Sequence, residues 1–503
     1  NPQRLSAVDS AAVALANGVD ENLCAAGLNL SGFIPSQQDQ MKGYHMLQQP
    51  QQSDDLARLP AKPVDRIIEP LARFLRIEAA SGLLLLFVTA IALGLANSPF
   101  ADAFLSLWKT PLGLTLGAFE LNHSLKHWIN DGLMAIFFFV VGLEVKRELV
   151  LGELRDLRTA ALPIIAAAGG MVVPASLYLA GQLGQPGERG WGIPMATDIA
   201  FVVGCLAILG TRVPQGLRIV LLSLAIADDI GAILVIAIGY TGQLNVAALF
   251  AGLLGLGVVR GLARLGVRSI PIYCIVGMVI WLAFHASGVH ATIAGVILGL
   301  LTPAHVWVSA GRLHAIVQQF TAYVEGERWS NDGKNHAALR KIQVAAREVL
   351  SPLERLETAL HPWVSFVIMP LFALANAGVS INVTDFREPV AVAVMVGLGI
   401  GKPVGIVSIS WLAVRVGIAK LPEGVSWSVL AAGGILAGIG FTMALFIAGL
   451  ALEGALLNAA KVGILSGSAL CAVIGSLLLL WLLPKPVFLK GRTVSARHRA
   501  GDF

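Results

Sequence analysis

Residues 216–239 read GLRIVLLSLAIADDIGAILVIAIG, an apolar run with two adjacent aspartates near its middle. A helix that crosses the hydrocarbon core of a bilayer needs about 20 mainly apolar residues, so this run predicts a transmembrane helix. An ionised side chain near the centre of such a helix costs about 2.5–3.5 kcal/mol on insertion scales. Asp228 and Asp229 are therefore expected to face protein or water, and to mark the path of an ion or a proton.

The whole composition agrees with this interpretation. Of 503 residues, 56% are hydrophobic and 13% are charged, whereas soluble domains carry about 25% charged residues. We predict an all-α polytopic membrane protein with 12 transmembrane helices. The predicted spans are 78–97, 128–146, 159–182, 191–210, 216–239, 244–265, 270–285, 288–303, 363–380, 389–415, 427–450 and 459–483.

The basic residues predict the orientation. They recur in every second connection, from Lys146 and Arg147 to the last tail, whereas connections such as 240–245 carry none. The positive-inside rule then places both termini in the cytoplasm. The net charge of +5 is dispersed in small clusters, which argues against a nucleic-acid partner. Cys205, Cys274 and Cys471 lie in apolar runs and are expected to be small buried hydrophobic residues.

The chain divides into three parts. Residues 1–70 are polar and rich in Gln, Ser and Asp, without the pattern of a signal peptide, and predict a flexible tail. Residues 71–485 form the predicted twelve-helix domain, and 486–503 form a basic cytoplasmic tail.

Two connections have structure of their own. Within a cytoplasmic insertion at 304–361, apolar residues from Leu339 to Leu353 recur at helical spacing, and Ser351 to Glu354 resembles a capping box. We expect amphipathic helices along the membrane surface. Alternating leucines before Gly117 predict a β-hairpin at 111–123. It would provide either the contact of a homodimer or a cover for the loop.

Three further anomalies accompany the paired aspartates. The segment Pro194–Asp198 would interrupt the fourth span, with Asp198 as a cap of the broken helix. Lys402 lies deep in the tenth span and needs a carboxylate or carbonyl partner, unless it snorkels to an interface. The glycines of 433–440 indicate either close helix packing or a second broken helix in the eleventh span. Interrupted spans at matching positions point to inverted-topology repeats, here spans 3–5 and 10–12 with broken, crossing helices 4 and 11.

The chain resembles the NhaA family of bacterial sodium/proton antiporters from about Phe74 to Leu483. Inverted repeats are a property described for this family itself. The resemblance rests on several sequence motifs that occur in a fixed order along the chain. These are Val141-Gly-Leu-Glu-Val-Lys-Arg-Glu-Leu149, Ala196-Thr-Asp-Ile-Ala200, Asp228-Asp-Ile-Gly-Ala232, Ser287-Gly-Val-His-Ala-Thr292, Leu360-His-Pro-Trp363, Gly401-Lys-Pro403 and Gly438-Ile-Gly-Phe-Thr-Met443.

The resemblance implies a function and a set of site residues. It implies an electrogenic, pH-regulated exporter of Na⁺ or Li⁺ in exchange for protons, with no cofactor. Asp229 would be the main ion-binding carboxylate, and Asp228 would pair with Lys402. Thr197 would add an oxygen ligand for Na⁺, while Asp198 and Lys402 would offset the charges of the broken helix ends.

A second group is implied at the cytoplasmic ends of spans 2 and 9. In the family such residues form a pH-sensing cluster, although surface ion pairs would explain the same pattern. His290 is a further candidate sensor, or equally a hydrogen-bonded interfacial histidine. Asp131 is expected to be interface structure. The members of the cluster would be Glu144, Arg147, Glu148 and Glu357.

Other functions fit less well. An intramembrane aspartyl protease needs a Tyr-Asp and a Gly-x-Gly-Asp setting, and neither precedes Asp198, Asp228 or Asp229. A passive cation channel would conduct without a proton gradient. The alternative closest to an antiporter is a sodium-coupled symporter of a small organic anion, which needs a substrate pocket.

Overall fold

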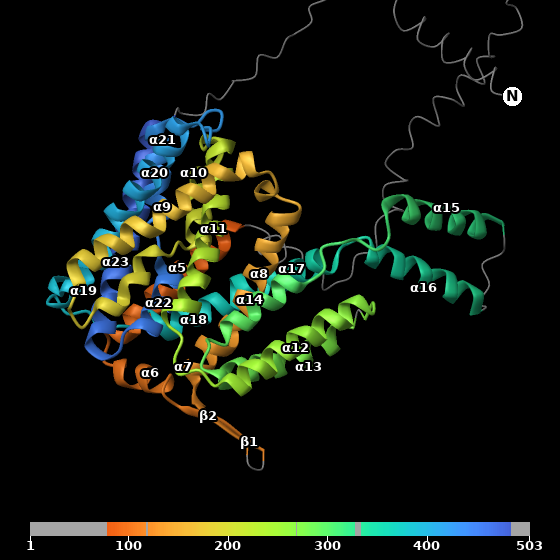
Figure 1. The fold of residues 1–503 in the computed structure, drawn as a ribbon, viewed down its shortest axis with the longest axis horizontal. Helices are drawn as coiled ribbons and strands as arrows, with labels where there is room; N and C mark the ends of the chain where they lie inside the picture. The colour runs from red at the N-terminus through yellow and green to blue at the C-terminus, as the bar shows by residue number, and fades with distance from the viewer. Residues whose placement is uncertain (1–77, 117–118, 268, 327–332, 484–503) are drawn as a thin grey trace, which may run out of the picture. The chain divides into compact units, whose positions relative to one another are not determined.

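The computed structural model describes residues 78–116, 119–267, 269–326 and 333–483. The predicted tails at 1–70 and 486–503 lie outside these residues. Nearly all of the described chain is helical, with one two-stranded antiparallel sheet (Figure 1).

Nine helices of the described chain are long and apolar enough to cross a membrane, or up to eleven if each of two bent pairs counts as one span. The nine spans are α7 (Leu125–His127) with η2 (Trp128–Leu133) and α8 (Met134–Val150), α9 (Leu157–Gln182), η4 (Glu188–Met195) with α10 (Ile199–Leu209), α11 (Gln215–Gly239), α12 (Val246–Arg264), α13 (Ile270–Ser287), α17 (Pro352–Trp363) with η6 (Val364–Ile368) and α18 (Met369–Asn376), α19 (Pro389–Val396) with η8 (Gly397–Gly401) and α20 (Lys402–Val416), and α23 (Gly454–Leu482). The bent pairs are α5 (Glu78–Ala96) with α6 (Ala101–Leu107), at 120°, and α21 (Trp427–Ala437) with α22 (Phe441–Ala451), at 49°.

Every predicted span overlaps a helix, but one of them is short. The predicted span 288–303 is α14 (Thr292–Leu301), whose ten residues rise only about 15 Å at 1.5 Å per residue. Helix α14 packs against α8, where the carbonyl oxygen of Val296 faces Gly142 at a distance that leaves no room for a side chain. The apolar, multi-span character of the chain is confirmed, whereas the number twelve stays a prediction.

Helices α9 and α20 approach each other through glycines. A methyl group added to Gly169 would meet the carbonyl oxygen of Gly405, and one added to Gly405 would meet that of Gly169. Small residues allow two backbones this close, which is typical of helix pairs within a bilayer. This contact brings Lys402, at the start of α20, towards the centre of the bundle, where it is fully buried.

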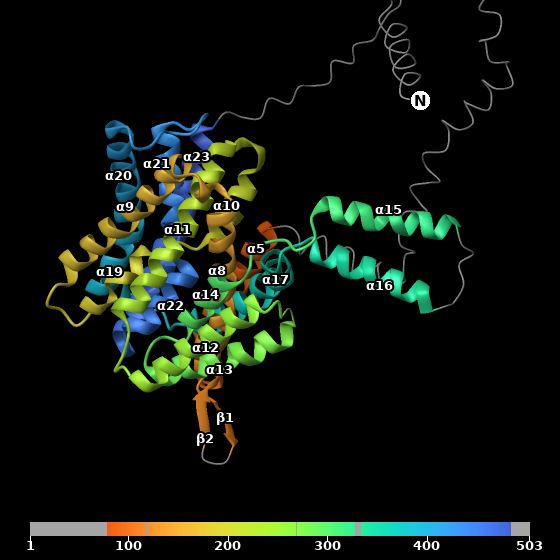
Figure 2. The ribbon, with the colours of Figure 1, turned by 45° about the vertical axis from the view of Figure 1, so that its right-hand side comes forward.

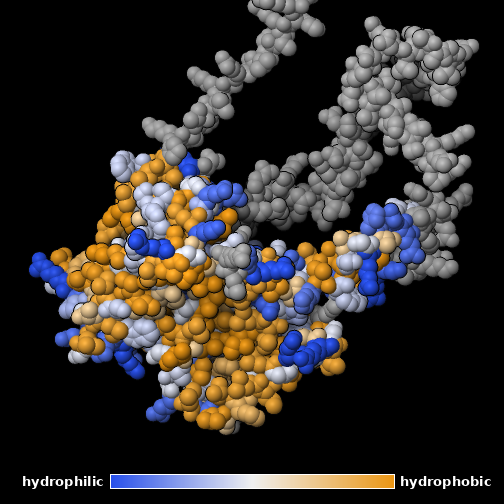
Figure 3. Space-filling view, turned by 45° about the horizontal axis from the view of Figure 1, so that its top comes forward, coloured by the Kyte–Doolittle hydropathy of each residue, from blue (hydrophilic) through white to orange (hydrophobic). Residues whose placement is uncertain are grey.

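The outer surface is apolar. In the space-filling view, hydrophobic residues cover most of the visible face of the helical bundle (Figure 3). Exposed apolar patches of this extent indicate contact with lipid. Cys274 belongs to this surface, so the prediction of a buried side chain was wrong there, because α13 turns that face outward with Ile275 and Met278. Cys471 is buried, Cys205 is half-buried, and all three are free thiols.

The predicted features of two connections are present. Strands β1 (Pro111–Leu116) and β2 (Phe119–Ser124) pair antiparallel, with Leu112 opposite His123. Ser351 and Glu354 form a capping box at the start of α17. The spacing from Leu339 to Leu353 is not one helix, however, because α16 (Gly333–Glu348) ends before this cap. Helix α15 (Ala310–Gly326) precedes α16 in the chain. Three short 3₁₀ helices lie elsewhere in the described chain, namely η3 (Glu153–Arg155), η5 (Gly210–Arg212) and η7 (Asp385–Arg387).

Candidate functional site

Two interrupted helices meet at their breaks, residues 196–198 and 438–440, and we call this meeting point the crossing. Residues 196–198 separate η4 from α10, and residues 438–440 separate α21 from α22. The Asp198 amide donates a hydrogen bond of 2.7 Å to the Ile439 carbonyl oxygen, which joins the two breaks. Helix starts carry a partial positive charge and helix ends a partial negative charge, each about half an elementary charge. The crossing therefore brings charges of both signs into the interior.

Asp198 lies at the positive ends. Its Oδ1 accepts a hydrogen bond from the Phe201 amide at 3.3 Å, so it caps α10. Its Oδ2 accepts from the amide of Thr442 at 3.0 Å and from the Thr442 hydroxyl, in the first turn of α22. One buried carboxylate thus holds the start of both half-helices, and the predicted capping position of Asp198 is present.

Lys402 lies at a negative end. Its Nζ donates a hydrogen bond to the carbonyl oxygen of Met195, the last residue of η4. The same nitrogen is 2.9 Å from Oδ2 of Asp228. The side chain is fully buried, which excludes snorkelling to an interface. The π-helical turn η8 directly precedes Lys402, and such turns often occur at functional sites.

Thr197 joins Asp228 to the second break. Its hydroxyl lies 2.6 Å from Asp228 Oδ2 and 2.9 Å from the carbonyl oxygen of Ala437, the last residue of α21. A hydroxyl has one proton, so it can donate to only one of these oxygens at a time. The choice depends on whether Asp228 holds a proton of its own.

The paired aspartates keep oxygens free. Asp228 Oδ1 is buried without a hydrogen-bond partner. Asp229 is 4% exposed, and no hydrogen bond or ion pair joins its carboxylate to another of the described residues. Electrostatically it lies among Glu144, Asp228 and Asp198, with Lys402 as the opposing charge. Buried oxygens without donors, in a net negative setting, are suited to a proton or a hard cation.

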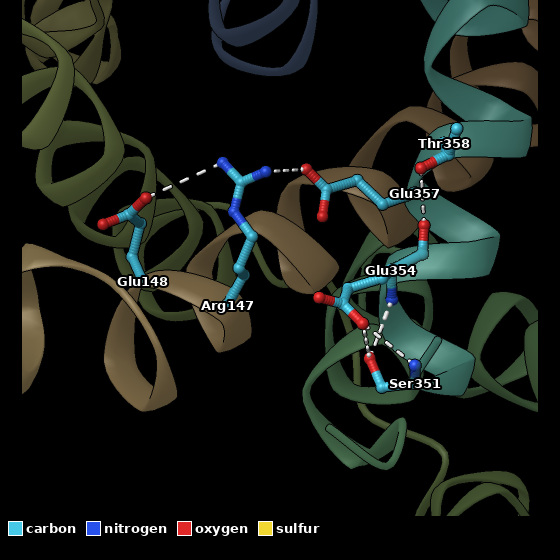
Figure 4. Close-up of polar contacts among 6 residues, drawn as sticks. All are labelled: Arg147, Glu148, Ser351, Glu354, Glu357 and Thr358. Carbon is cyan, nitrogen blue, oxygen red and sulfur yellow. Dashed lines mark hydrogen bonds and ion pairs between the residues drawn. The ribbon is translucent and has the colours of Figure 1, made fainter. Parts of the chain in front are cut away.

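The second predicted group forms partly exposed ion pairs. Arg147, at the end of α8, lies between two carboxylates and points towards both (Figure 4). Its Nη1 donates to Glu357 Oε1 of α17, and its Nη2 lies 3.7 Å from Glu148 Oε1. Glu144 lies about one helical turn earlier in α8 and is half-buried. Its negative charge interacts electrostatically with Asp229.

The remaining candidates lie elsewhere. The His290 Nε2 is 3.0 Å from the carbonyl oxygen of Tyr240, which is the hydrogen-bonded interfacial arrangement. Asp131 lies beside His127 and His285, at 3.5 and 3.7 Å. Neither residue contacts the crossing through a described hydrogen bond.

The structure adds residues that the sequence did not single out. Thr442 lies in the motif Gly438–Met443, but only the glycines of that motif predict a break in the helix. Ser468 of α23 accepts a hydrogen bond from the Phe441 amide at 3.1 Å and completes the start of α22. The carbonyl oxygens of Met195 and Ala437 have no signature in side-chain sequence. The signal available for them was the position of each break.

Comparisons with known proteins agree with these features. Residues 72–479 match the family described as Na⁺/H⁺ antiporter 1. The chain is 54% identical over 453 residues to the Na(+)/H(+) antiporter NhaA 3 of Acidiphilium cryptum, covering 89% of this chain and 98% of that protein. It is 56% identical over 428 residues to the Na(+)/H(+) antiporter NhaA of Rhodopirellula baltica, covering 85% and 97%. With the NhaA of Rhizobium meliloti the identity is 56% over 434 residues, covering 86% and 99%.

Proposed function

This chain belongs to the NhaA family of Na⁺/H⁺ antiporters, and we propose that Asp228 and Asp229 carry its exchange of sodium ions for protons. It is a multi-pass membrane transporter whose substrates are small cations and protons. The observation that carries the proposal is the buried, unpartnered oxygen of Asp228 beside an Asp229 carboxylate without a described donor.

The exchange rests on competition for these oxygens. Sodium is a hard cation that binds oxygen ligands, and a carboxylate must lose its proton before it can bind a metal ion. At high internal pH the aspartates ionise and capture Na⁺ or Li⁺. After the site opens to the opposite face, protons displace the ion.

Lys402 and Thr197 adjust Asp228 during this cycle. Without a cation, Lys402 neutralises Asp228 at 2.9 Å. An arriving cation replaces that charge, and Lys402 keeps its hydrogen bond to the Met195 carbonyl. When Asp228 is protonated, the carboxyl group can donate to Thr197, whose own proton then turns to Ala437 at 2.9 Å. Thr197 thereby has both lone pairs free for Na⁺ only while Asp228 is ionised.

The wider architecture belongs to the same proposal. Twelve spans would arise if α14 and both bent pairs each count as one, with inverted repeats formed by spans 3–5 and 10–12. Both termini would lie in the cytoplasm, in the inner membrane, with the β1–β2 hairpin outside as a homodimer contact. More protons than sodium ions would move per cycle, so the membrane potential contributes about 2.3 kcal/mol per charge and 100 mV. Glu144, Arg147, Glu148 and Glu357 would set the activating pH.

The direct test replaces Asp229 by asparagine. Asp229→Asn keeps the shape of the side chain and removes its charge, so we expect no sodium/proton exchange in proteoliposomes at any pH. The matched control is Asp102→Asn, an exposed aspartate of α6, which should exchange at the wild-type rate. Exchange retained by Asp229→Asn would refute the role of Asp229.

A further inference from the structure

Three histidines gather at the foot of the β1–β2 hairpin, apart from the crossing. His123 is in β2, His127 in α7 and His285 near the end of α13. Figures 1 and 2 both place β2 beside one end of the α12–α13 pair, and Figure 1 shows α7 at the same end. One nitrogen of each ring lies within 4.8 Å of one nitrogen of each of the others. All three side chains are partly buried.

A carboxylate lies beside two of these histidines. Asp131 in η2 follows His127 by one helical turn, as His127 follows His123 by four residues. Its Oδ2 lies 3.5 Å from His127 Nε2 and 3.7 Å from His285 Nδ1. These separations exceed those of normal hydrogen bonds, about 2.7–3.2 Å. They are close to the distance of about 3.3 Å between ligand atoms around a tetrahedral Zn²⁺ with bonds of about 2.0–2.1 Å.

One nitrogen of the cluster has no hydrogen bond to the described residues, although the Asp131 carboxylate lies 3.5 Å away. His127 Nε2 is buried and accepts or donates no hydrogen bond among the described residues. A buried polar atom without a partner costs free energy, so it indicates a ligand at that point. Imidazole nitrogen and carboxylate oxygen are ligands that Zn²⁺ binds well.

The surroundings hold the ligands in place. The Trp281 indole stacks on His285 with ring centroids 5.6 Å apart, and its Nε1 donates to the Asp131 carbonyl oxygen at 3.2 Å. The Trp128 indole stacks on Trp281 at 6.2 Å, and its Nε1 donates to the Leu112 carbonyl oxygen at 2.8 Å. Two ligand-bearing segments, 123–131 and 281–285, are thus joined by contacts that need no metal. Such outer contacts orient metal ligands.

We propose that His123, His127 and His285 form a binding site for one divalent transition-metal ion of the Zn²⁺ class, with the Asp131 carboxylate beside two of these ligands. These ligands come from two segments of the chain, so the ion would be structural: it ties the base of the hairpin to α13. The site is separate from the exchange of sodium and protons, and its test does not depend on transport.

The test is a Zn²⁺ titration of the full chain in detergent, without an affinity tag and after treatment with a chelator. Calorimetry should give one Zn²⁺ per chain, and the ion should raise the melting temperature. His285→Gln and His123→Gln should each weaken binding at least about tenfold, since loss of even an outer-shell partner weakens metal binding by about 10–100-fold. The matched control is His314→Gln, an exposed histidine of α15, which should bind as the wild type does.

Two outcomes would overturn the proposal. One is the absence of stoichiometric binding to the wild type, which would make the cluster aromatic packing alone. The other is unchanged binding in both cluster variants. If these variants fail to fold, Co²⁺ added to the wild type decides: the intense visible absorption of a tetrahedral nitrogen and oxygen site supports the proposal, and a weak octahedral spectrum contradicts it.

Discussion

The crossing of the interrupted helices and the Arg147 cluster both contain acidic and basic residues, but they handle charge differently. At the crossing, Asp198 and Lys402 are buried and each contacts a helix end as well as another side chain. In the cluster, the Arg147 side chain is 39% exposed and forms ion pairs with the carboxylates of Glu148 and Glu357. Water screens the second group and cannot screen the first. The crossing should therefore control stability and transport together, and the cluster should act on pH dependence alone.

The largest loss of stability is expected from Lys402→Ala. Removing one partner of a buried ion pair leaves the other charge uncompensated, which costs about 3–5 kcal/mol. The change also removes the donor to the end of η4. We expect a much lower melting temperature in detergent and an altered pH profile of exchange.

The neighbouring charge and an exposed lysine provide the controls for Lys402→Ala. Combining it with Asp228→Asn should recover part of the stability, because no charge is then left unpaired. Lys420→Ala, at an exposed position, should change nothing. A double variant as unstable as Lys402→Ala, or an unaltered pH profile, would remove the Asp228–Lys402 pair from the account.

A smaller loss is expected from Asp198→Ala. The substitution removes the caps of α10 and α22, where a cap contributes about 0.5–2 kcal/mol and a charged hydrogen bond about 1.5–3 kcal/mol. A total of about 2–5 kcal/mol should appear in thermal melting. Thr442→Val should cost only about 1–2 kcal/mol, since Asp198 would still cap α10 and accept from the Thr442 amide. Equal costs for the two variants would show that Asp198 does not serve both helices.

The smallest effect on stability is expected from Arg147→Gln. Partly exposed ion pairs contribute about 0–1 kcal/mol, so the melting temperature should hardly move. The loss of a positive charge between Glu148 and Glu357 should instead shift the pH at which exchange begins. Sodium-exchange rates across a pH series measure this. A large loss of stability with an unshifted pH profile of exchange would show that these ion pairs stabilise the fold, as those of the crossing do.

Much of the architecture was predictable because it follows from local rules. Pro194 and the glycines before Phe441 predicted both interruptions, alternating leucines predicted the hairpin, and Ser351 predicted the start of α17. The number of spans did not follow in the same way. An apolar run predicts burial, but α14 has only ten residues, fewer than the roughly 17–25 that a single span needs, and it packs against α8 through glycines.

The candidate site was predictable in its charges and not in its contacts. Charged residues within apolar runs are conspicuous, so Asp228, Asp229 and Lys402 were identified. The carbonyl oxygens of Met195 and Ala437 could not be, since every residue has one. The histidine cluster was missed because His285 is far along the chain from His123, and only the fold of α13 against the hairpin brings them together.

Measuring sodium binding and proton release together tests whether the paired aspartates hold either a proton or a sodium ion. Purified protein should be titrated with Na⁺ in weakly buffered solutions between about pH 6 and 9. Because a carboxylate cannot hold both a proton and the ion, we expect bound Na⁺ to expel protons. The apparent Kd for Na⁺ should fall as the pH rises. Asp229→Asn should show neither effect. Sodium binding that releases no protons and keeps one affinity across this pH range would contradict the competition of Na⁺ and protons for these carboxylates.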